Sequence, residues 1–209
     1  MDDDTFAWDR TWQVVAAQHG DDPLRFTGEH RLEGRSIRVE LPLVVPPAAP
    51  DESVDTWLAR LPHRLGLHWV ILLQAGAASL GAFDDGEVLH TKSEKKYVVR
   101  GTGRAQPTHL KTRGKSRYGS RLRLQNAKRL LSEVNQRLTD WLAELGAPER
   151  VFCSCPVRLW ADLRAADPPL PLAESLPRTK IPLDLPVPTT EVLLRTYRRL
   201  CHGRVVPLS

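Results

Sequence analysis

The stretch from residue 67 to residue 100, LHWVILLQAGAASLGAFDDGEVLHTKSEKKYVVR, predicts the centre of a β-sheet. Leu67 to Gln74 form a largely apolar run, which is typical of a strand buried on both faces. The triplet Asp84-Asp85-Gly86 then separates two short strand-like segments, and this pattern predicts a hairpin with a glycine turn. Together the segments predict a meander of adjacent antiparallel strands. The expected strands are residues 67–74, 77–83, 87–90 and 94–100.

A long amphipathic helix is predicted downstream, from Gly119 to Leu145, because apolar residues recur there at intervals of three and four. Gly146 and Pro148 follow as helix-ending residues. At a rise of about 1.5 Å per residue, this helix would be roughly 40 Å long. Its expected apolar face consists of Leu122, Ala127, Leu130, Leu131, Val134, Leu138, Trp141, Leu142 and Leu145.

Shorter helices and strands are predicted elsewhere in the sequence. Helices are expected over residues 8–19, 51–65, 156–164 and 191–201, and strands over residues 36–45, 151–155 and 181–185. Asp9 is the candidate cap of the first helix, and Gly20 is expected to end it. Because strands and helices alternate in the second half, we expect an α/β (α+β) fold with a mixed β-sheet covered by helices. Residues 1–209 are expected to form a single domain, with an N-terminal helix and strand portion (1–66) and a core (67–202).

The segment from Lys92 to Arg129 holds the positive charge of the chain. It contains thirteen Lys and Arg residues and one acid, Glu94, whereas the remainder has seventeen basic and twenty-four acidic residues. The net charge of +5 therefore arises from one cluster, which implies a polyanionic partner such as nucleic acid. Within it, the glycines and cations of residues 101–118 predict a long mobile loop that carries Gln106 at the tip of Gly101–Gln106.

Composition also bounds the class of protein. The longest apolar run, Trp69–Leu73, is too short to span a bilayer, and the first residues, MDDD, lack the features of a secretory signal. We therefore expect a cytoplasmic protein, most simply a monomer, without a membrane partner. Three cysteines without disulfide spacing fit a reducing compartment, and Cys153 and Cys155 are expected to be core residues on one strand face. We expect no metal and no cofactor.

Two familiar nucleotide-binding motifs are present only in part, because each lacks a required glycine. Gly101-x-Gly103-x-x-Gln106 has Gln at the third glycine position of the dinucleotide fingerprint, and no helix follows at once. Gly114-Lys115-Ser116 resembles the end of a P-loop, but His109 stands where that motif requires glycine. His90 and His109 flank the loop and could aid catalysis or contact phosphate, although an ordinary surface or core role is favoured.

Several motifs follow one another between Trp69 and Thr190. They are WVILLQAGAASLGAF, EVLHTKSEKKYVVR ending at Arg100, GTGRAQ ending at Gln106, the helix start G-x-x-L-R-x-x-N from Gly119 to Asn126, a helix that continues to Trp141, and a K-I-P…P-x-P-T stretch from Lys180 to Thr189. In this order and spacing, the segment from Val70 to Leu200 resembles the Vms-like release-factor family. Its members are peptidyl-tRNA hydrolases related to the catalytic domain of the eukaryotic and archaeal termination factor.

The resemblance implies a release-factor catalytic-domain-like, RNase H-like fold with a long basic loop. It also implies a ribosome-associated peptidyl-tRNA hydrolase that frees nascent chains from stalled ribosomes or large subunits. Gln106 would position water at the ester, since a neutral amide offers both donors and an acceptor. Gly103 would keep the loop slender, and Arg104 would stiffen it or contact phosphate. The cations expected to contact ribosomal or tRNA phosphates are Arg100, Lys111, Arg113, Lys115, Arg117, Arg121, Arg123 and Lys128.

Three alternatives stay open at the level of sequence. The family's loop commonly reads Gly-Gly-Gln or Gly-Ser-Gln, whereas Arg104-Ala105 precede Gln106 here, which motivates a non-catalytic ribosome- or tRNA-binding module. Some relatives cut the tRNA near its 3′ end, and Arg100 and Arg104 would be candidates to assist that reaction. A metal-dependent nuclease is the weakest alternative, because Glu94 is the only carboxylate of the basic segment.

Overall fold

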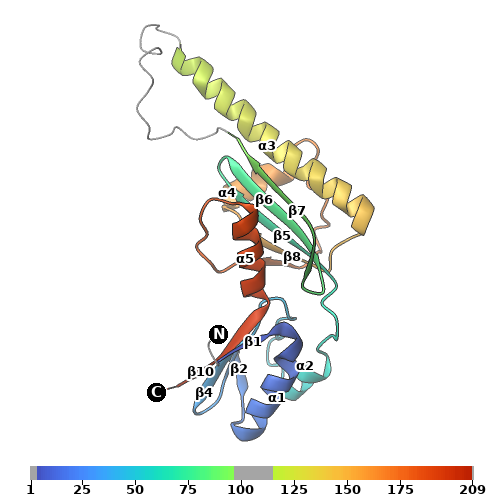
Figure 1. The fold of residues 1–209 in the computed structure, drawn as a ribbon, viewed down its shortest axis with the longest axis vertical. Helices are drawn as coiled ribbons and strands as arrows, with labels where there is room; N and C mark the ends of the chain where they lie inside the picture. The colour runs from blue at the N-terminus through green and yellow to red at the C-terminus, as the bar shows by residue number, and fades with distance from the viewer. Residues whose placement is uncertain (1–3, 97–114, 209) are drawn as a thin grey trace. The chain divides into compact units, whose positions relative to one another are not determined.

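The computed structural model describes residues 4–96 and 115–208, and for residues 115–120 it describes the backbone alone. Figure 1 shows the order of the elements along the chain. They are β1 (Thr5–Ala7), a 3₁₀ turn η1 (Trp8–Arg10), α1 (Thr11–Asp21), β2 (Arg25–Gly28), β3 (Arg31–Glu33), β4 (Ile37–Glu40), α2 (Val54–Ala59), β5 (Leu67–Gln74), β6 (Ala77–Asp84), β7 (Glu87–Lys95), α3 (Lys115–Leu145), β8 (Arg150–Ser154), α4 (Val157–Arg164), β9 (Arg178–Lys180), α5 (Thr190–Leu200) and β10 (His202–Pro207).

Contacts divide the chain into two compact units. The first combines Met1–Leu65 with Leu194–Ser209, and the second is Gly66–Leu193. The first boundary coincides with the expected one between an N-terminal portion and a core. The return of the C-terminal residues to the first unit was not anticipated from the sequence. That the whole chain acts as one domain stays a prediction.

The second unit is built on a mixed five-stranded sheet of order β7-β6-β5-β8-β9. Strands β7, β6 and β5 run antiparallel, whereas β8 pairs in parallel with β5 on one side and with β9 on the other. Three antiparallel strands continued by two parallel ones are the strand arrangement of an RNase H-like sheet. The predicted fold class, a mixed sheet covered by helices, is confirmed.

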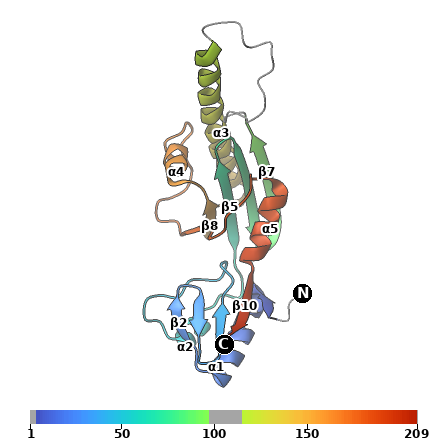
Figure 2. The same cartoon turned by 90° about the vertical axis from the view of Figure 1, so that its left-hand side faces the viewer.

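Strand β5 matches its predicted range, and its apolar run is explained by burial on both faces. Trp69, Ile71 and Leu73 pack with α3 in one core cluster. On the other face, Gly81 of β6 lies so close to Leu193, at the start of α5, that an added Cβ atom would come within 3.0 Å of its side chain. Figure 2 shows α3 and the start of α5 on different sides of these strands. Residues 68–73 of the central strand are therefore buried, whereas Leu67 and Gln74 at its ends are partly exposed.

The hairpin after β6 has a two-residue turn. Asp85 and Gly86 both have positive φ, 48° and 91°, which is the backbone pattern of a type I′ turn matched to the twist of the strands. The prediction of two separate strands after this turn was wrong, because β7 runs unbroken from Glu87 to Lys95. No turn-forming residue interrupts that range, and Ser93 Oγ lies 2.8 Å from Ser79 Oγ across the ladder.

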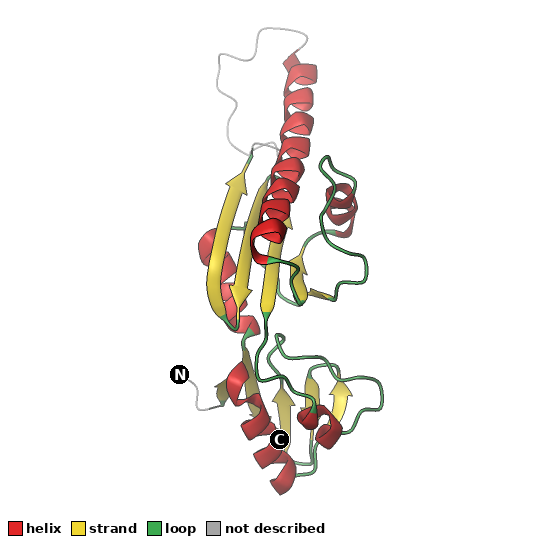
Figure 3. Cartoon of the chain, turned by 90° about the vertical axis from the view of Figure 1, so that its right-hand side faces the viewer, coloured by secondary structure: helices red, strands yellow, loops and turns green. Residues whose placement is uncertain are grey.

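Helix α3 begins at Lys115, four residues before the predicted start, so residues 115–118 belong to the helix and not to the loop. Its apolar face is also shorter than predicted. Leu122 and Leu124 are 39% and 61% exposed, and the buried stripe begins at Leu130. Figure 3 shows the reason, because the first turns of α3 extend past the ends of the strands.

The second half of this unit follows the predicted order with one shift. Strand β9 covers Arg178–Lys180, whereas the sequence predicted residues 181–185. Ile181 still donates its N–H to the carbonyl of Cys153 at 2.8 Å, but Pro182 has no N–H and ends the ladder there. Helix α5 is capped by Thr189, whose Oγ1 atom accepts a hydrogen bond from the N–H of Val192.

The first unit contains an antiparallel five-stranded sheet of order β1-β10-β4-β3-β2. Several sequence predictions were wrong here. Asp9 lies in the 3₁₀ turn and does not cap α1, and Gly20 lies inside the helix. The predicted helix 51–65 is only α2, with Ser53 as its cap, and the predicted strand 36–45 is only β4. Among the helices that the structure describes, none is long and apolar enough to cross a membrane.

Candidate nucleic-acid interface

Helix α3 carries the predicted phosphate-contacting residues that the structure describes. Arg121 and Lys128 are exposed, and Arg123 is half-buried. Arg121 and Lys128 are seven residues apart, so two turns of helix bring them to the same side. Neither has an ion pair with another described residue. Their charges are therefore available to an external anion.

The remaining predicted site residues divide into two groups. Lys115 and Arg117 occupy the first turn of α3, where only the backbone is described. The others lie outside the described residues, so the structure does not test their predicted roles. These are Arg100, Gly103, Arg104, Gln106, Lys111 and Arg113, together with His109.

The three acids of α3 each contact a basic side chain, which is Lys or Arg for two of them and His for the third. Asp140 lies 3.6 Å from Arg137, and Glu144 lies 3.0 Å from the ring of His90. The third acid, Glu133, contacts Lys96 and Arg129. The acids of the helix lie in its second half, whereas Arg121 and Lys128 add positive charge to its first half. This separation leaves a cationic surface at the end of α3 that follows the loop.

A charge cluster joins α3 to the last described residue before the loop. Glu133 Oε1 accepts hydrogen bonds from Lys96 Nζ at 2.9 Å and from Arg129 Nε at 2.8 Å. Its second oxygen lies 2.6 Å from the same ammonium nitrogen, as an ion-pair contact. Burial raises the pKa of Glu133, but the bonds from Lys96 and Arg129 outweigh it and hold the pKa below its ordinary value. The sequence did not predict this cluster, because Lys96 lies 37 residues from Glu133 along the chain.

His90 makes structural contacts within the second unit and does not line a candidate site. Its ring stacks on Trp141, with centroids 5.9 Å apart and an interplanar angle of 18°. Its Nε2 atom lies 3.0 Å from Glu144. These contacts fit the ordinary role that the sequence favoured.

The burial and the pKa of the cysteines are those of core residues and not of reactive thiols. Cys153 and Cys201 are buried, and Cys155 is half-buried. Burial raises the pKa of Cys155 and of Cys201 to about 12, so both thiols stay protonated at neutral pH. Among the described residues, no cluster of three or more His, Cys, Asp and Glu side chains could hold a metal ion.

Comparison with known proteins decides the family. The family model described as the Bacteroidetes VLRF1 release factor matches residues 68–207, which is more than half of the chain. The chain belongs to this release-factor family. The match confirms the Vms-like release-factor resemblance seen in the motifs. Membership in the release-factor family connects the protein with translation and the ribosome.

A solved structure, described as the Vms1 mitochondrial localization core, has a similar fold. The TM-score is 0.50 at 11% identity, and the match covers 96% of this chain and 84% of that chain. At this identity the similarity shows the fold alone. No curated protein matches the chain.

Proposed function

We propose that this release-factor family member is a peptidyl-tRNA hydrolase that frees nascent chains from stalled ribosomes or large subunits. Gln106, which follows Gly103 in the loop between β7 and α3, is the observation that carries the proposal. Family membership and the cationic surface of α3 support it. On this proposal the protein acts in the cytoplasm as a monomer.

The chemistry assigned to Gln106 needs no acid–base pair. The ribosome already orients the ester of peptidyl-tRNA, so the protein must place a water molecule and stabilise the developing oxyanion. A Gln amide can accept a hydrogen bond from water and donate one to the oxyanion, and it carries no charge to desolvate. Gly103 allows close approach of the backbone in a narrow channel. Arg104 would contact phosphate next to the reacting group.

The basic residues are proposed to hold the domain on large-subunit rRNA and on the tRNA of the substrate. Contacts to phosphate position a protein without reading sequence, which suits a factor that must act on any stalled chain. Arg121, Arg123 and Lys128 would extend along α3 the contacts that the loop begins. The full proposed set is Arg100, Lys111, Arg113, Lys115, Arg117, Arg121, Arg123 and Lys128.

Peptidyl-tRNA release tests the role of Gln106. Large subunits carrying peptidyl-tRNA are incubated with the wild type, with Gln106→Ala and with Gln13→Ala, which changes an exposed Gln of α1. We expect Gln106→Ala to lower the release rate about 100-fold or more, as loss of an oxyanion donor does. Gln13→Ala should release at the wild-type rate. Equal rates for all three proteins would remove Gln106 from the mechanism.

The tRNA product separates ester hydrolysis from tRNA cleavage, the alternative that Arg100 and Arg104 raise. Hydrolysis leaves the complete 3′ end on the tRNA, whereas cleavage shortens the tRNA and leaves its last nucleotides on the peptide. Mass spectrometry of both products distinguishes the two reactions. Stable binding to the same complexes without either product would instead favour the non-catalytic binding module that Arg104-Ala105 suggest.

A further inference from the structure

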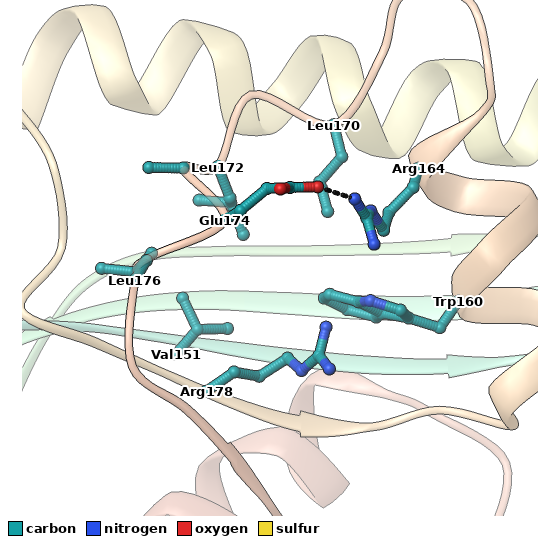
Figure 4. A pocket seen from close by; sticks show the side chains of 9 residues that line it. Val151, Trp160, Arg164, Leu170, Leu172, Glu174, Leu176 and Arg178 are labelled. Carbon is teal, nitrogen blue, oxygen red and sulfur yellow. Dashed lines mark hydrogen bonds and ion pairs between the residues drawn. The ribbon is translucent and has the colours of Figure 1, made fainter.

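A cavity of about 530 Å³ lies beside the β8–β9 edge of the second unit. Strand β8, helix α4, strand β9 and the segment between α4 and β9 surround it (Figure 4). Its volume is within the usual range of small-ligand sites, about 300–1,000 Å³. The side chains that define its character are Trp160, Arg164, Leu170, Leu172, Glu174 and Arg178.

Trp160 offers the cavity a stacking surface. The guanidinium carbon of Arg178 lies 4.6 Å from the centre of the indole ring, so a cation holds one face of the ring. The indole N–H is buried and has no hydrogen-bond partner among the described residues. Because this nitrogen is buried, it does not face the open space of the cavity, and the face of the ring is the part of Trp160 that a ligand can contact.

Arg164 and Glu174 form an ion pair at the opening of the cavity. Their side chains are 53% and 84% exposed, so water screens the pair and it can exchange for contacts with a ligand. The guanidinium of Arg164 has the planar fork of donors that matches a phosphate group. The carboxylate of Glu174 can accept hydrogen bonds from ring N–H or amino groups.

Apolar side chains form part of the cavity wall, beside the charged groups. Leu170, Leu172 and Leu176 come from the segment that follows α4, and Val151 comes from β8. Leucine side chains opposite an indole ring make a slot suited to a flat, mainly apolar group. Charged groups at the opening and apolar groups inside therefore favour a ligand with a planar ring system and an attached anion.

The segment that carries these leucines is fixed to α3. Asn135 is fully buried, and its Nδ2 atom donates to the carbonyls of Leu163 at 2.8 Å and Pro168 at 2.7 Å. Ser132 Oγ donates to the carbonyl of Asp167. Lys128 precedes Asn135 by seven residues, about 10 Å along the helix axis. One helix therefore supports both the exposed cations and the wall of the cavity.

We propose that this cavity binds a single unstacked nucleotide of an RNA strand. The base lies between Trp160 and the leucines, and its phosphate contacts Arg164 and Arg178. Aromatic side chains and Arg planes are the usual platforms for unstacked RNA bases, because every base has a π-face. An apolar peptide would use the leucines but leave Arg164, Glu174 and Arg178 without a function. The site goes beyond the proposed hydrolysis, because no step at the ester uses it.

The indole N–H signal of Trp160 in a nitrogen–proton NMR spectrum tests the proposal directly. The full chain is labelled with nitrogen-15, and the signal is assigned by its absence from the spectrum of Trp160→Phe. A five-nucleotide single-stranded RNA is then added, and in separate samples AMP and a five-residue apolar peptide. We expect the RNA to shift this signal, and AMP to do so only at much higher concentration.

Binding of the same RNA, measured by fluorescence polarisation at fixed salt, gives the size of the effect. We expect Trp160→Ala to weaken binding about 10-fold, as loss of one stacked base does, and Trp160→Phe to weaken it less. Trp12→Ala, which removes an exposed tryptophan of the first unit, is the matched control and should bind like the wild type. Trp160→Phe keeps a ring of similar size, so it serves if the alanine variant does not fold.

Three outcomes would overturn the proposal. They are RNA binding that leaves the Trp160 signal unmoved, a shift caused by the peptide but not by RNA, and a response to AMP equal to that of the RNA. The first would place the RNA elsewhere, and the other two would assign the cavity to a peptide or to free nucleotides. Because binding is measured without peptidyl-tRNA, an inactive Gln106 would not affect the result.

Discussion

Lys128 is the residue whose charge the structure leaves most plainly available to RNA. It is exposed on α3 and has no ion pair among the described residues, whereas Arg137 of the same helix lies 3.6 Å from Asp140. We expect Lys128→Ala to weaken binding to large subunits and to reduce by about one the slope of log affinity against log salt. The loss arises because one fewer phosphate is neutralised and fewer counterions are released.

Arg137→Ala is the matched control for Lys128, because it removes a cation that is already paired. Its salt slope should stay near that of the wild type. Affinity is measured by sedimentation with large subunits at several salt concentrations. An equal reduction of the slope in both variants would show that the charge of α3 acts as a whole, and would remove the distinction between paired and available cations.

At the scale of elements, Glu133 connects the end of β7 with the middle of α3 through Lys96 and Arg129. We expect Glu133→Gln to lower the free energy of unfolding at pH 7 by about 1 kcal/mol, since the pair is partly solvated. The pKa of Glu133 lies below its ordinary value of 4.5 in the folded protein. Its stabilising contribution is therefore complete above pH 4.5 and disappears as the pH falls through the lowered pKa.

Urea unfolding of both proteins at pH 7 and at successively lower pH measures this contribution. The difference between wild type and Glu133→Gln should be largest at neutral pH and should shrink below pH 4.5. Asp140→Asn is the comparison, because its ion pair is longer and nearly half-exposed, so it should change stability by less than about 0.5 kcal/mol. A difference for Glu133→Gln that grows on acidification would contradict the ion-pair explanation.

Elements with a strong pattern of their own were predictable, and elements that depend on a distant partner were not. β5 and β8 are buried apolar runs, and α3 repeats its pattern over many turns, so each was predicted to within a few residues. Strand β10 pairs with three residues of β1 and four of β4, all far away in sequence, and its own residues show no clear alternation. The cations of α3 were predictable because charge is a local property. The Glu133 cluster and the Trp160 cavity were not, because each exists only where distant segments meet.

At the scale of the whole molecule, the two ends of the chain build one unit. Strand β10 lies between β1 and β4, and the N–H of Trp8 donates to the carbonyl of Cys201 at 2.8 Å. Gly203 is the tightest point of this arrangement. A Cβ atom there would lie 2.5 Å from the ring of Phe6 and 2.6 Å from the carbonyl oxygen of Glu40. The first unit therefore has no room for a side chain at residue 203.

We expect Gly203→Ala to destabilise the first unit by about 2–3 kcal/mol, because backbone and ring must shift to admit one methyl group. Gly20→Ala is the opposite test within the same unit. Nothing lies within 4 Å of a Cβ atom at Gly20, and this residue is inside α1, so alanine should stabilise the unit by about 0.5–1 kcal/mol.

Hydrogen exchange of backbone amides measures both changes unit by unit. Gly203→Ala should accelerate exchange in β1, β4 and β10 together, because β10 is paired with both other strands. Strands β5 and β8 of the second unit should stay protected. Faster exchange confined to β10 would show instead that the C-terminal strand opens alone, and that the first sheet keeps its order without it.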